Sequence, residues 1–359
     1  MTRKSITRET NLKEMFGSCP LPITDHPRIV LAHGSGGKMT QRLLEKMVLP
    51  QFGNELLNTQ HDGAVFSVGD QRVAFSTDSF VVKPIFFPGG DIGSLAVHGT
   101  VNDLAMCGAK PLYLSAAFII EEGMAMEDFW RILQSMRAAA DQAGVLLVTG
   151  DTKVVDRGKG DQIFINTSGV GLVHEGAQID PKRARPGDKI LINGPIAAHG
   201  MAVLSVREGL AFETELLSDS APLNELVEVM LAADPGLHVL RDPTRGGVTS
   251  ALTEIAGTAQ LGVELIEAAI PIDEAVQGAC ELLGLDPLYV ANEGKVIALV
   301  APERAEALLS AMRSHPLGRQ AALIGEVVEA HPGMVLMKTK VGGQRVVDML
   351  SGEQLPRIC

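Results

Sequence analysis

The chain has 359 residues, of which 46% are hydrophobic and 21% charged, and its formal net charge is −12. This length suggests two domains, and the composition predicts a globular protein with sizeable hydrophobic cores. The acidic balance argues against binding to nucleic acid, which needs a basic surface, and against an anionic membrane, and it requires cations at any polyphosphate site.

The four cysteines, Cys19, Cys107, Cys280 and Cys359, lie far apart and form no CxxC pair. This spacing favours a reduced, cytoplasmic protein over a disulfide framework or a zinc site. The N-terminus lacks the apolar core of a signal peptide, and no apolar run approaches the roughly 18 residues of a membrane span. We therefore expect a soluble cytoplasmic protein.

The first half of the chain alternates predicted strands with two helices. Residues 1–27 are polar and without a clear period, and we interpret them as an N-terminal extension. Residues 91–107 are typical of a helix with Asp91 as its N-cap, and the apolar stripe of 127–143 indicates a helix packed on a core. Strands are predicted at 64–68, 73–75, 80–82, 112–120, 145–148 and 163–173, and the strand at 145–148 is expected to be short and buried.

The second half starts near the turn at 183–188. Helical patterns follow at 198–209, 222–233, 247–260, 273–283 and 302–314, and strands are predicted at 189–192, 262–266, 295–300 and 334–338. This mixture of helices and strands indicates two domains of the α/β or α+β class.

The chain ends in Pro356-Arg357-Ile358-Cys359, which places a thiol and a carboxylate on one carbon at the end of a tether. Gly342-Gly343 and Ser351-Gly352 provide hinges. An incidental cysteine on a frayed end is the alternative, whereas prenylation requires the cysteine four residues from the end. We interpret 339–359 as a flexible, mobile tail that carries a reactive Cys359.

Glycines recur at two predicted turns. The stretch Gly34-Ser35-Gly36-Gly37-Lys38 fails the P-loop pattern, because Ala32 stands where a glycine is needed and Met39 follows the lysine. It is either a flexible turn or a backbone cradle for phosphates. Residues 241–247 precede a predicted helix whose N-terminus, with Arg245, suits an anion, although an ordinary helix cap explains the same residues.

Aspartates stand at or near the ends of predicted elements. Asp62 and Asp78 adjoin apolar strands, where aspartate is a poor strand former and a surface turn is the alternative. Asp103 lies on a small, apolar helix face and needs a lysine, an arginine or a metal ion as partner. Asp151 directly follows a predicted buried strand, where open α/β sheets place ligand-binding residues. With Asp242, these five acids suggest Mg²⁺ ions that clamp a nucleoside triphosphate.

Six stretches and the terminal Pro-Arg-Ile-Cys together resemble one family. The stretches are 33–38, 77–84, 98–105, 150–153, 242–247 and 291–295. They are similar to the hydrogenase-maturation carbamoyl dehydratases, the HypE family, which belongs to the ATP-binding superfamily of aminoimidazole ribonucleotide synthetase and selenophosphate synthetase. The match runs from about residue 29 to the C-terminus and leaves 1–27, with Cys19, outside.

The resemblance implies a two-domain aminoimidazole ribonucleotide synthetase-like fold. An α/β domain at 28–178 would bind ATP and pair with its copy in a homodimer, and an α+β domain at 179–338 would precede the tail, with ATP and Mg²⁺ between the domains. It also implies that a carbamoyltransferase loads a carboxamide onto Cys359. ATP would phosphorylate the amide oxygen, and loss of phosphate would leave a thiocyanate, whose cyanide passes to [NiFe]-hydrogenase iron held by other maturation proteins.

The resemblance assigns roles residue by residue. Cys359, Lys153 and Glu293 would be catalytic; a phosphate clamp is the alternative for Lys153, and a turn residue paired with Lys295 is the alternative for Glu293. Asp62, Asp78, Asp103, Asp151 and Asp242 would hold Mg²⁺ and phosphates. The nucleotide would be bound by Gly34, Ser35, Gly36, Gly37, Lys38, Asn102, Thr152, Arg245, Gly246 and Gly247.

Two rival functions remain. A selenophosphate synthetase, or another ATP-dependent enzyme of the superfamily, is one of them; the selenophosphate reaction would use a reactive cysteine or selenocysteine near the glycine stretch, and 33–38 contains neither. The other is a carrier without catalytic activity, in which nucleotide acts as a conformational switch and the tail only ferries a group.

Overall fold

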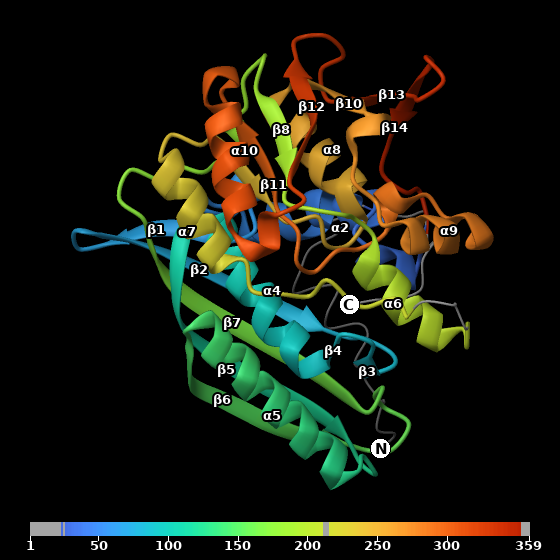
Figure 1. Ribbon diagram of the computed structural model, residues 1–359. Coiled ribbons are helices and arrows are strands. Elements are labelled where there is room, and N and C mark those ends of the chain that lie inside the picture. Colours follow the sequence, from blue (N-terminus) through green and yellow to red (C-terminus); the bar gives the residue numbers. More distant parts are fainter. Residues whose placement is uncertain (1–22, 24–25, 211–214, 353–359) are drawn as a thin grey trace, which may run out of the picture.

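The computed structural model describes residues 23, 26–210 and 215–352 (Figure 1). Two sheet-containing domains are stacked on each other, and a short helical segment precedes the first of them. This segment contains the 3₁₀ turn Leu31–Gly34, α2 (Lys38–Leu43), a π-helical turn (Leu44–Val48) and α3 (Leu49–Phe52). The expected N-terminal extension falls almost wholly outside the described residues.

The first domain is a five-stranded sheet with helices on one face. Its strand order is β1-β2-β7-β5-β6, in which only β5 and β6 are parallel. The strands are β1 (Ala64–Val68), β2 (Gln71–Phe80), β5 (Ala109–Glu121), β6 (Leu146–Val155) and β7 (Ile163–Val173), and a separate small hairpin contains β3 (Phe86–Phe87) and β4 (Gly90–Asp91). Helices α4 (Ile92–Met106) and α5 (Met126–Ala143) cover one face of the sheet (Figure 1).

Local signals explain both helices. The Asp91 carboxylate accepts hydrogen bonds from the backbone N–H groups of Gly93 and Ser94, which caps α4. Almost every residue of α4 is buried, because the helix lies between its own sheet and the second domain. Helix α5 buries one stripe that includes Ile132 and Met136, and it ends at Gly144, which has a positive φ.

The second domain is a seven-stranded sheet covered on both faces. The strand order is β14-β13-β10-β12-β8-β11-β9. Its strands are β8 (Lys189–Ile192), β9 (Val239–Arg241), β10 (Gly262–Ile266), β11 (Ile297–Val300), β12 (Ala322–Val328), β13 (Val335–Lys338) and β14 (Gln344–Val347). Its helices are α6 (Ala198–Arg207), α7 (Asn224–Ala233), α8 (Gly247–Ala259), α9 (Glu274–Leu283) and α10 (Ala305–Ser314).

Alternation along β11 shows how this sheet is buried. Ile297 and Leu299 pack toward α6, α8 and α9, whereas Ala298 and Val300 pack toward α7 and α10. Strands buried on both faces read as continuous apolar runs, which is why the predicted strand at 295–300 was found. Among the described residues, no helix combines the length and apolar character that a membrane span requires.

Three expectations about strands were wrong. The strands predicted at 73–75 and 80–82 are largely one strand, β2, which continues through Asp78 because it pairs with β7 along this length. The strand predicted at 145–148 as short and buried continues to Val155 and is exposed, because β6 is an edge strand. Strands β9, β12 and β14 were not predicted.

The tail begins later than residue 339. Strand β14 pairs antiparallel with β13 around a turn at 339–343, and the side chains of Val347 and Met349 are buried. Main-chain pairing and side-chain burial therefore hold this part of the predicted tail in the second domain. Pro356 to Cys359 lie outside the described residues.

Candidate functional site

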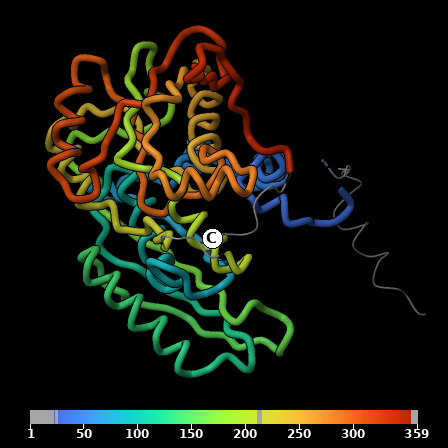
Figure 2. The backbone as a smooth tube through the Cα atoms, turned by 45° about the vertical axis from the view of Figure 1, so that its right-hand side comes forward, coloured from blue at the N-terminus to red at the C-terminus, as the bar shows by residue number. Residues whose placement is uncertain are grey.

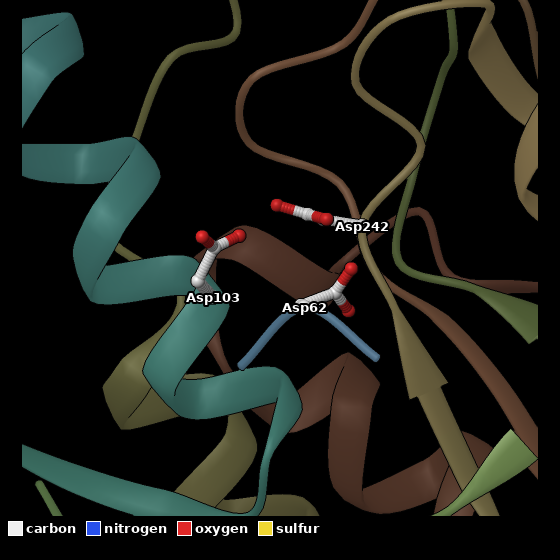
Figure 3. Close-up of side chains that lie close together, drawn as sticks. All are labelled: Asp62, Asp103 and Asp242. Atoms are coloured by element: carbon white, nitrogen blue, oxygen red, sulfur yellow. The ribbon is translucent and has the colours of Figure 1, made fainter. Parts of the chain in front are cut away.

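Three predicted ligands converge where the two domains meet. Asp62 precedes β1, Asp103 lies in the last turn of α4, and Asp242 follows β9. Figure 3 shows the three carboxylates turned toward a common point, and one oxygen atom of each lies within 4.8 Å of the others. Because two of these side chains come from the first domain and one from the second, the site depends on how the domains are stacked.

Neighbouring side chains fix two of these carboxylates. The Ser76 hydroxyl lies 2.6 Å from Asp103 Oδ2 and 2.9 Å from the carbonyl oxygen of Asp62. The Arg241 guanidinium pairs with Asp62, with Nε 3.0 Å from Oδ1, and it also contacts Glu254. The second oxygen of Asp62 is buried and has no hydrogen-bond partner among the described residues.

The electrostatics of the cluster favour a bound cation. Burial raises the pKa of Asp62 to about 6 despite Arg241, and burial together with the neighbouring aspartates raises the pKa of Asp103 and Asp242 well above the usual range. Burial also raises the pKa of Asp78 and Glu293, against the opposing charge of Arg245. Buried carboxylates that repel one another are costly to ionise without a counter-charge.

Glu293 lies close to this cluster and is held by its backbone. Its side chain is buried, and its N–H group donates to Asp219 Oδ1 at 3.2 Å. The expected alternative, a pair with Lys295, is wrong, because Lys295 forms its ion pair with Asp219 at 3.0 Å. Asn102 donates to the carbonyl oxygens of Ala221 and Glu293 and accepts from the Leu223 N–H group. Asn102 therefore acts on the site by positioning these backbone segments.

The glycine stretch 34–38 is packed against the start of α8. Arg245 donates to the carbonyl oxygen of Gly34 at 3.3 Å, and the Ser250 hydroxyl donates to that of Gly36 at 3.0 Å. At Gly36, a Cβ atom would lie 2.8 Å from that of Arg245. Gly246 and Gly247, both with positive φ, form the turn that starts α8, where no side chain caps the helix. These contacts favour a fixed loop beside the acids over a flexible turn.

A cavity of about 810 Å³ adjoins the cluster and was not predicted. Apolar side chains from the segment before β1 line part of it, and Asp62, Arg241 and Glu254 lie at its wall. Its volume is within the range of small-molecule sites. Arg241 had a signal in the sequence, since it directly precedes Asp242, but residues 41–60 carry no pattern that indicates a cavity.

The structure does not bring Asp151, Thr152 and Lys153 to this cluster within one chain. All three lie on the edge strand β6, which β5 and β7 separate from β2 and Asp78. Lys153 pairs with Asp151 at 2.9 Å, and both side chains are more than half exposed. The hydrogen bond from Lys153 lowers the pKa of Asp151. Cys359 lies outside the described residues.

Comparison with known proteins identifies the family. The AIR synthase related protein family matches with its N-terminal domain at residues 60–173 and its C-terminal domain at residues 185–337. The carbamoyl dehydratase HypE of Cupriavidus necator is 57% identical over 333 residues, which cover 92% of this chain and 95% of that protein. This chain belongs to the HypE family. The family, the two-domain fold and the enzyme class expected from the sequence, carbamoyl dehydratase, are thereby confirmed.

Two solved HypE structures are similar over most of the chain. A HypE–HypF complex has a TM-score of 0.82 and 49% sequence identity, with 86% of this chain and 99% of that chain covered. A HypE in complex with ATP has a TM-score of 0.78 and 50% identity, with 92% and 100% covered. A relative in this family therefore binds ATP, and another assembles with HypF.

Proposed function

We propose that the protein uses Mg²⁺ and ATP to dehydrate an S-carboxamide on Cys359 to a thiocyanate. The product would supply the cyanide ligand for the iron of [NiFe]-hydrogenase. The observation that carries the proposal is the convergence of Asp62, Asp103 and Asp242 at the domain junction, in a chain of the HypE family. The ATP complex of a similar HypE supports the choice of nucleotide.

The residues of the cluster fit Mg²⁺. The available donors are carboxylate oxygens, which Mg²⁺ prefers, and one of them, Asp62 Oδ2, makes no hydrogen bond among the described residues and has only His61 Nδ1 nearby, at 3.5 Å. When bound, Mg²⁺ would offset the charge of the carboxylates and of the nucleotide phosphates. The adjoining cavity provides space for the rest of the nucleotide, and Arg245 contributes a positive charge on the side of Asp78 and Glu293.

The reaction balances without an oxidant or reductant. The carboxamide oxygen takes the γ-phosphoryl group, and ADP leaves. Both N–H protons are then lost, the C–O bond breaks, and phosphate departs with the oxygen, which leaves S–C≡N on Cys359. Glu293 is suited to accept a proton, because a carboxylate whose pKa is raised is a stronger base once it is ionised. Lys153 would orient the carboxamide if a second chain brings it to the site.

The partners follow from the same chemistry. A HypE solved with HypF supports the proposal that a HypF counterpart is the carbamoyltransferase that loads Cys359. The cyano group would pass to maturation proteins that hold the iron. Loading requires an accessible thiol, whereas dehydration requires the carboxamide beside the γ-phosphate, shielded from water.

The decisive experiment is mass spectrometry of the full-length protein after incubation with a HypF carbamoylation system. Without ATP, we expect a carboxamide adduct on the C-terminal peptide. With Mg²⁺ and ATP, this adduct should become lighter by one water, and the Cys359→Ala variant should carry neither form. A carboxamide that ATP leaves unchanged would support the carrier function instead. An adduct on Cys107 or Cys280 would exclude the terminal thiol as the reacting group.

A further inference from the structure

The glycine loop, residues 34–38, contacts the end of the described chain. The N–H group of Lys38 donates to the Leu350 carbonyl oxygen at 2.9 Å, and Lys38 Nζ lies 2.5 Å from Asp348 Oδ2. A Cβ atom at Gly37 would lie 2.6 Å from the same Leu350 oxygen, so the two backbones meet directly. Figure 2 shows this approach, where the red C-terminal segment descends to the blue N-terminal helices.

The described chain is held up to this contact. Strand β14 is paired with β13, and Arg345 forms an ion pair with Asp286 at 2.5 Å. The turn at 339–343 is closed by hydrogen bonds between Thr339 and the two glycines that follow. These bonds oppose a hinge at Gly342-Gly343. The first glycine after the contact is Gly352, and the sequence from 351 to 359, which we call the C-terminal arm, is long enough to span at most roughly 30 Å between Leu350 and Cys359.

The glycine loop also contacts residues at the start of α8. Arg245 and Ser250 bind the carbonyl oxygens of Gly34 and Gly36, and the charge of Arg245 acts on Asp78 and Glu293. The loop therefore contacts both Arg245, whose charge reaches the acids, and the root of the arm. Suppose that the loop has two conformations and that a ligand binds one of them more tightly. Binding of this ligand would then shift the loop and change its contact at Lys38.

We propose that Lys38 is a positioning residue that, with Asp348, latches the root of the C-terminal arm to the glycine loop. The latch fixes the position of the first residue of the arm that carries Cys359, at the edge of the nucleotide site. It also couples this position to nucleotide binding. The sequence assigned Lys38 to the nucleotide, but its ammonium group is paired with the Asp348 carboxylate. This inference rests on the proposed function, because it assumes that Cys359 must reach the site.

The test removes each partner of the latch separately. The variants are Lys38→Met, Asp348→Asn, their combination, and the charge swap Lys38→Asp with Asp348→Lys. Lys46→Met is the matched control, because Lys46 is also an exposed lysine and lies in the π-helical turn that follows α2. The main measurement is the rate at which a thiol reagent labels the C-terminal peptide of the full-length protein, with and without Mg²⁺ and ATP. Peptide mapping separates this label from that on other cysteines.

We expect ATP to slow labelling of Cys359 in the wild-type protein and in Lys46→Met. Both single latch variants should reduce this protection by a factor of about two to five, which is the range for an exposed ion pair. The combined variant should lose no more than either single variant, and the charge swap should recover part of the effect. Because the coupling is reciprocal, the dissociation constant of ATP should rise by the same factor in both single latch variants and stay unchanged in Lys46→Met.

Two results would overturn the latch. If Lys38→Met weakens ATP binding and Asp348→Asn does not, Lys38 binds the nucleotide and not the arm. If neither variant changes the protection of Cys359, the contact does not position the arm.

Hydrogen exchange tests the latch without any reaction. In the absence of nucleotide, Asp348→Asn should speed exchange of the Lys38 amide and of residues 344–350 relative to Lys46→Met. Unchanged exchange in Asp348→Asn would refute the latch even if the wild-type protein makes thiocyanate. Faster exchange in a protein that makes no thiocyanate would instead refute the proposed function and leave the latch standing.

Discussion

At the scale of single residues, the site is defined by buried carboxylates whose ionised form is energetically unfavourable in this environment. Burial and mutual repulsion raise the pKa of Asp103, and no lysine or arginine pairs with it among the described residues. The Ser76 hydroxyl is the direct polar contact of its side chain. A buried carboxylate of this kind costs stability in the absence of a counter-charge, which agrees with the proposed cation site.

Replacing Asp103 should separate stability from function. Asp103→Asn keeps an acceptor for Ser76 and removes a buried charge, so we expect thermal stability to stay equal or rise. The affinity for ATP in the presence of Mg²⁺ should fall by roughly tenfold or more, and the affinity without metal should change less. Calorimetric titration with and without Mg²⁺ measures both. Asp70→Asn, at an exposed turn, is the control, and equal losses with and without metal would argue against metal ligation.

His98 predicts a pH dependence of stability. Its side chain is buried, Nδ1 lies 3.0 Å from Ser220 Oγ, and burial lowers its pKa to about 4, against 6.5 in the unfolded chain. Between these values the unfolded state binds more protons, so stability present above pH 6.5 is lost as the pH falls toward 4, by at most roughly 3 kcal/mol. Urea unfolding should show a shallower pH slope for His98→Gln than for the wild-type protein. Parallel slopes would assign the dependence to other groups.

At the scale of elements, the glycine loop is fixed by close backbone contacts. Gly36 has a φ of 77°, and an added Cβ atom would lie 2.8 Å from that of Arg245. We therefore expect Gly36→Ala to cost roughly 1–3 kcal/mol of stability and to weaken ATP binding by moving the loop away from α8. Thermal unfolding and calorimetry measure the two effects. Gly34→Ala is the matched control, because no atom lies within 4 Å of its added Cβ; equal effects of both variants would contradict this role of Gly36.

Local sequence patterns predicted most helices and strands. The features that they did not predict depend on contacts between residues far apart in the sequence. The Asp91 cap and the stripe on α5 are local, so both helices were found within a residue of their ends. Strand β14 is four residues long and exists because β13 pairs with it. Asp62 was found because aspartate is conspicuous beside an apolar strand, and Asp103 because it lies on an apolar helix face, whereas the pairing of Arg241 with Asp62 joins distant parts of the chain. Proximity of this kind has no signal in a single sequence.

At the scale of the whole molecule, the arrangement of the first domain explains why β6, which the sequence predicted to be buried, is exposed. Helices α4 and α5 cover one face of the first sheet, and among the described residues no element covers the other (Figure 1). Large apolar side chains are exposed on this uncovered face: Val68, Phe75, Tyr113, Ile119, Leu146 and Leu172. An apolar surface of this extent marks an interaction site, and the sequence predicted burial that a single chain does not provide.

A second copy of the chain would also explain where Lys153 lies. Ile119 on β5 is directly opposite Lys153 on β6, so the two side chains share a face of the sheet. Ile119 is exposed and absent from the core beneath α4 and α5, which places both residues on the uncovered face. Within one chain Lys153 is remote from the acids, whereas a homodimer formed through this face could carry it to the partner's site.

We predict that the protein is a homodimer through this face and that Ile119→Asp makes it a monomer, because the variant buries a carboxylate in an apolar interface. Light scattering measures the mass. Leu282→Asp is the control, since Leu282 is even more exposed but lies on α9 of the other domain. A wild-type monomer at micromolar concentration, or an Ile119→Asp dimer, would contradict the interface.

Mixed dimers then test whether two chains share one site. If Lys153 of one chain serves Glu293 of its partner, Lys153→Ala and Glu293→Gln should each be inactive alone yet recover activity when their chains are mixed and exchanged. One site of such a dimer has both side chains intact, and the other has neither. If each site is built from a single chain, every site in the mixture contains one defect and the mixture stays inactive. Light scattering on the mixture confirms that dimers persist, so lost activity cannot be attributed to dissociation.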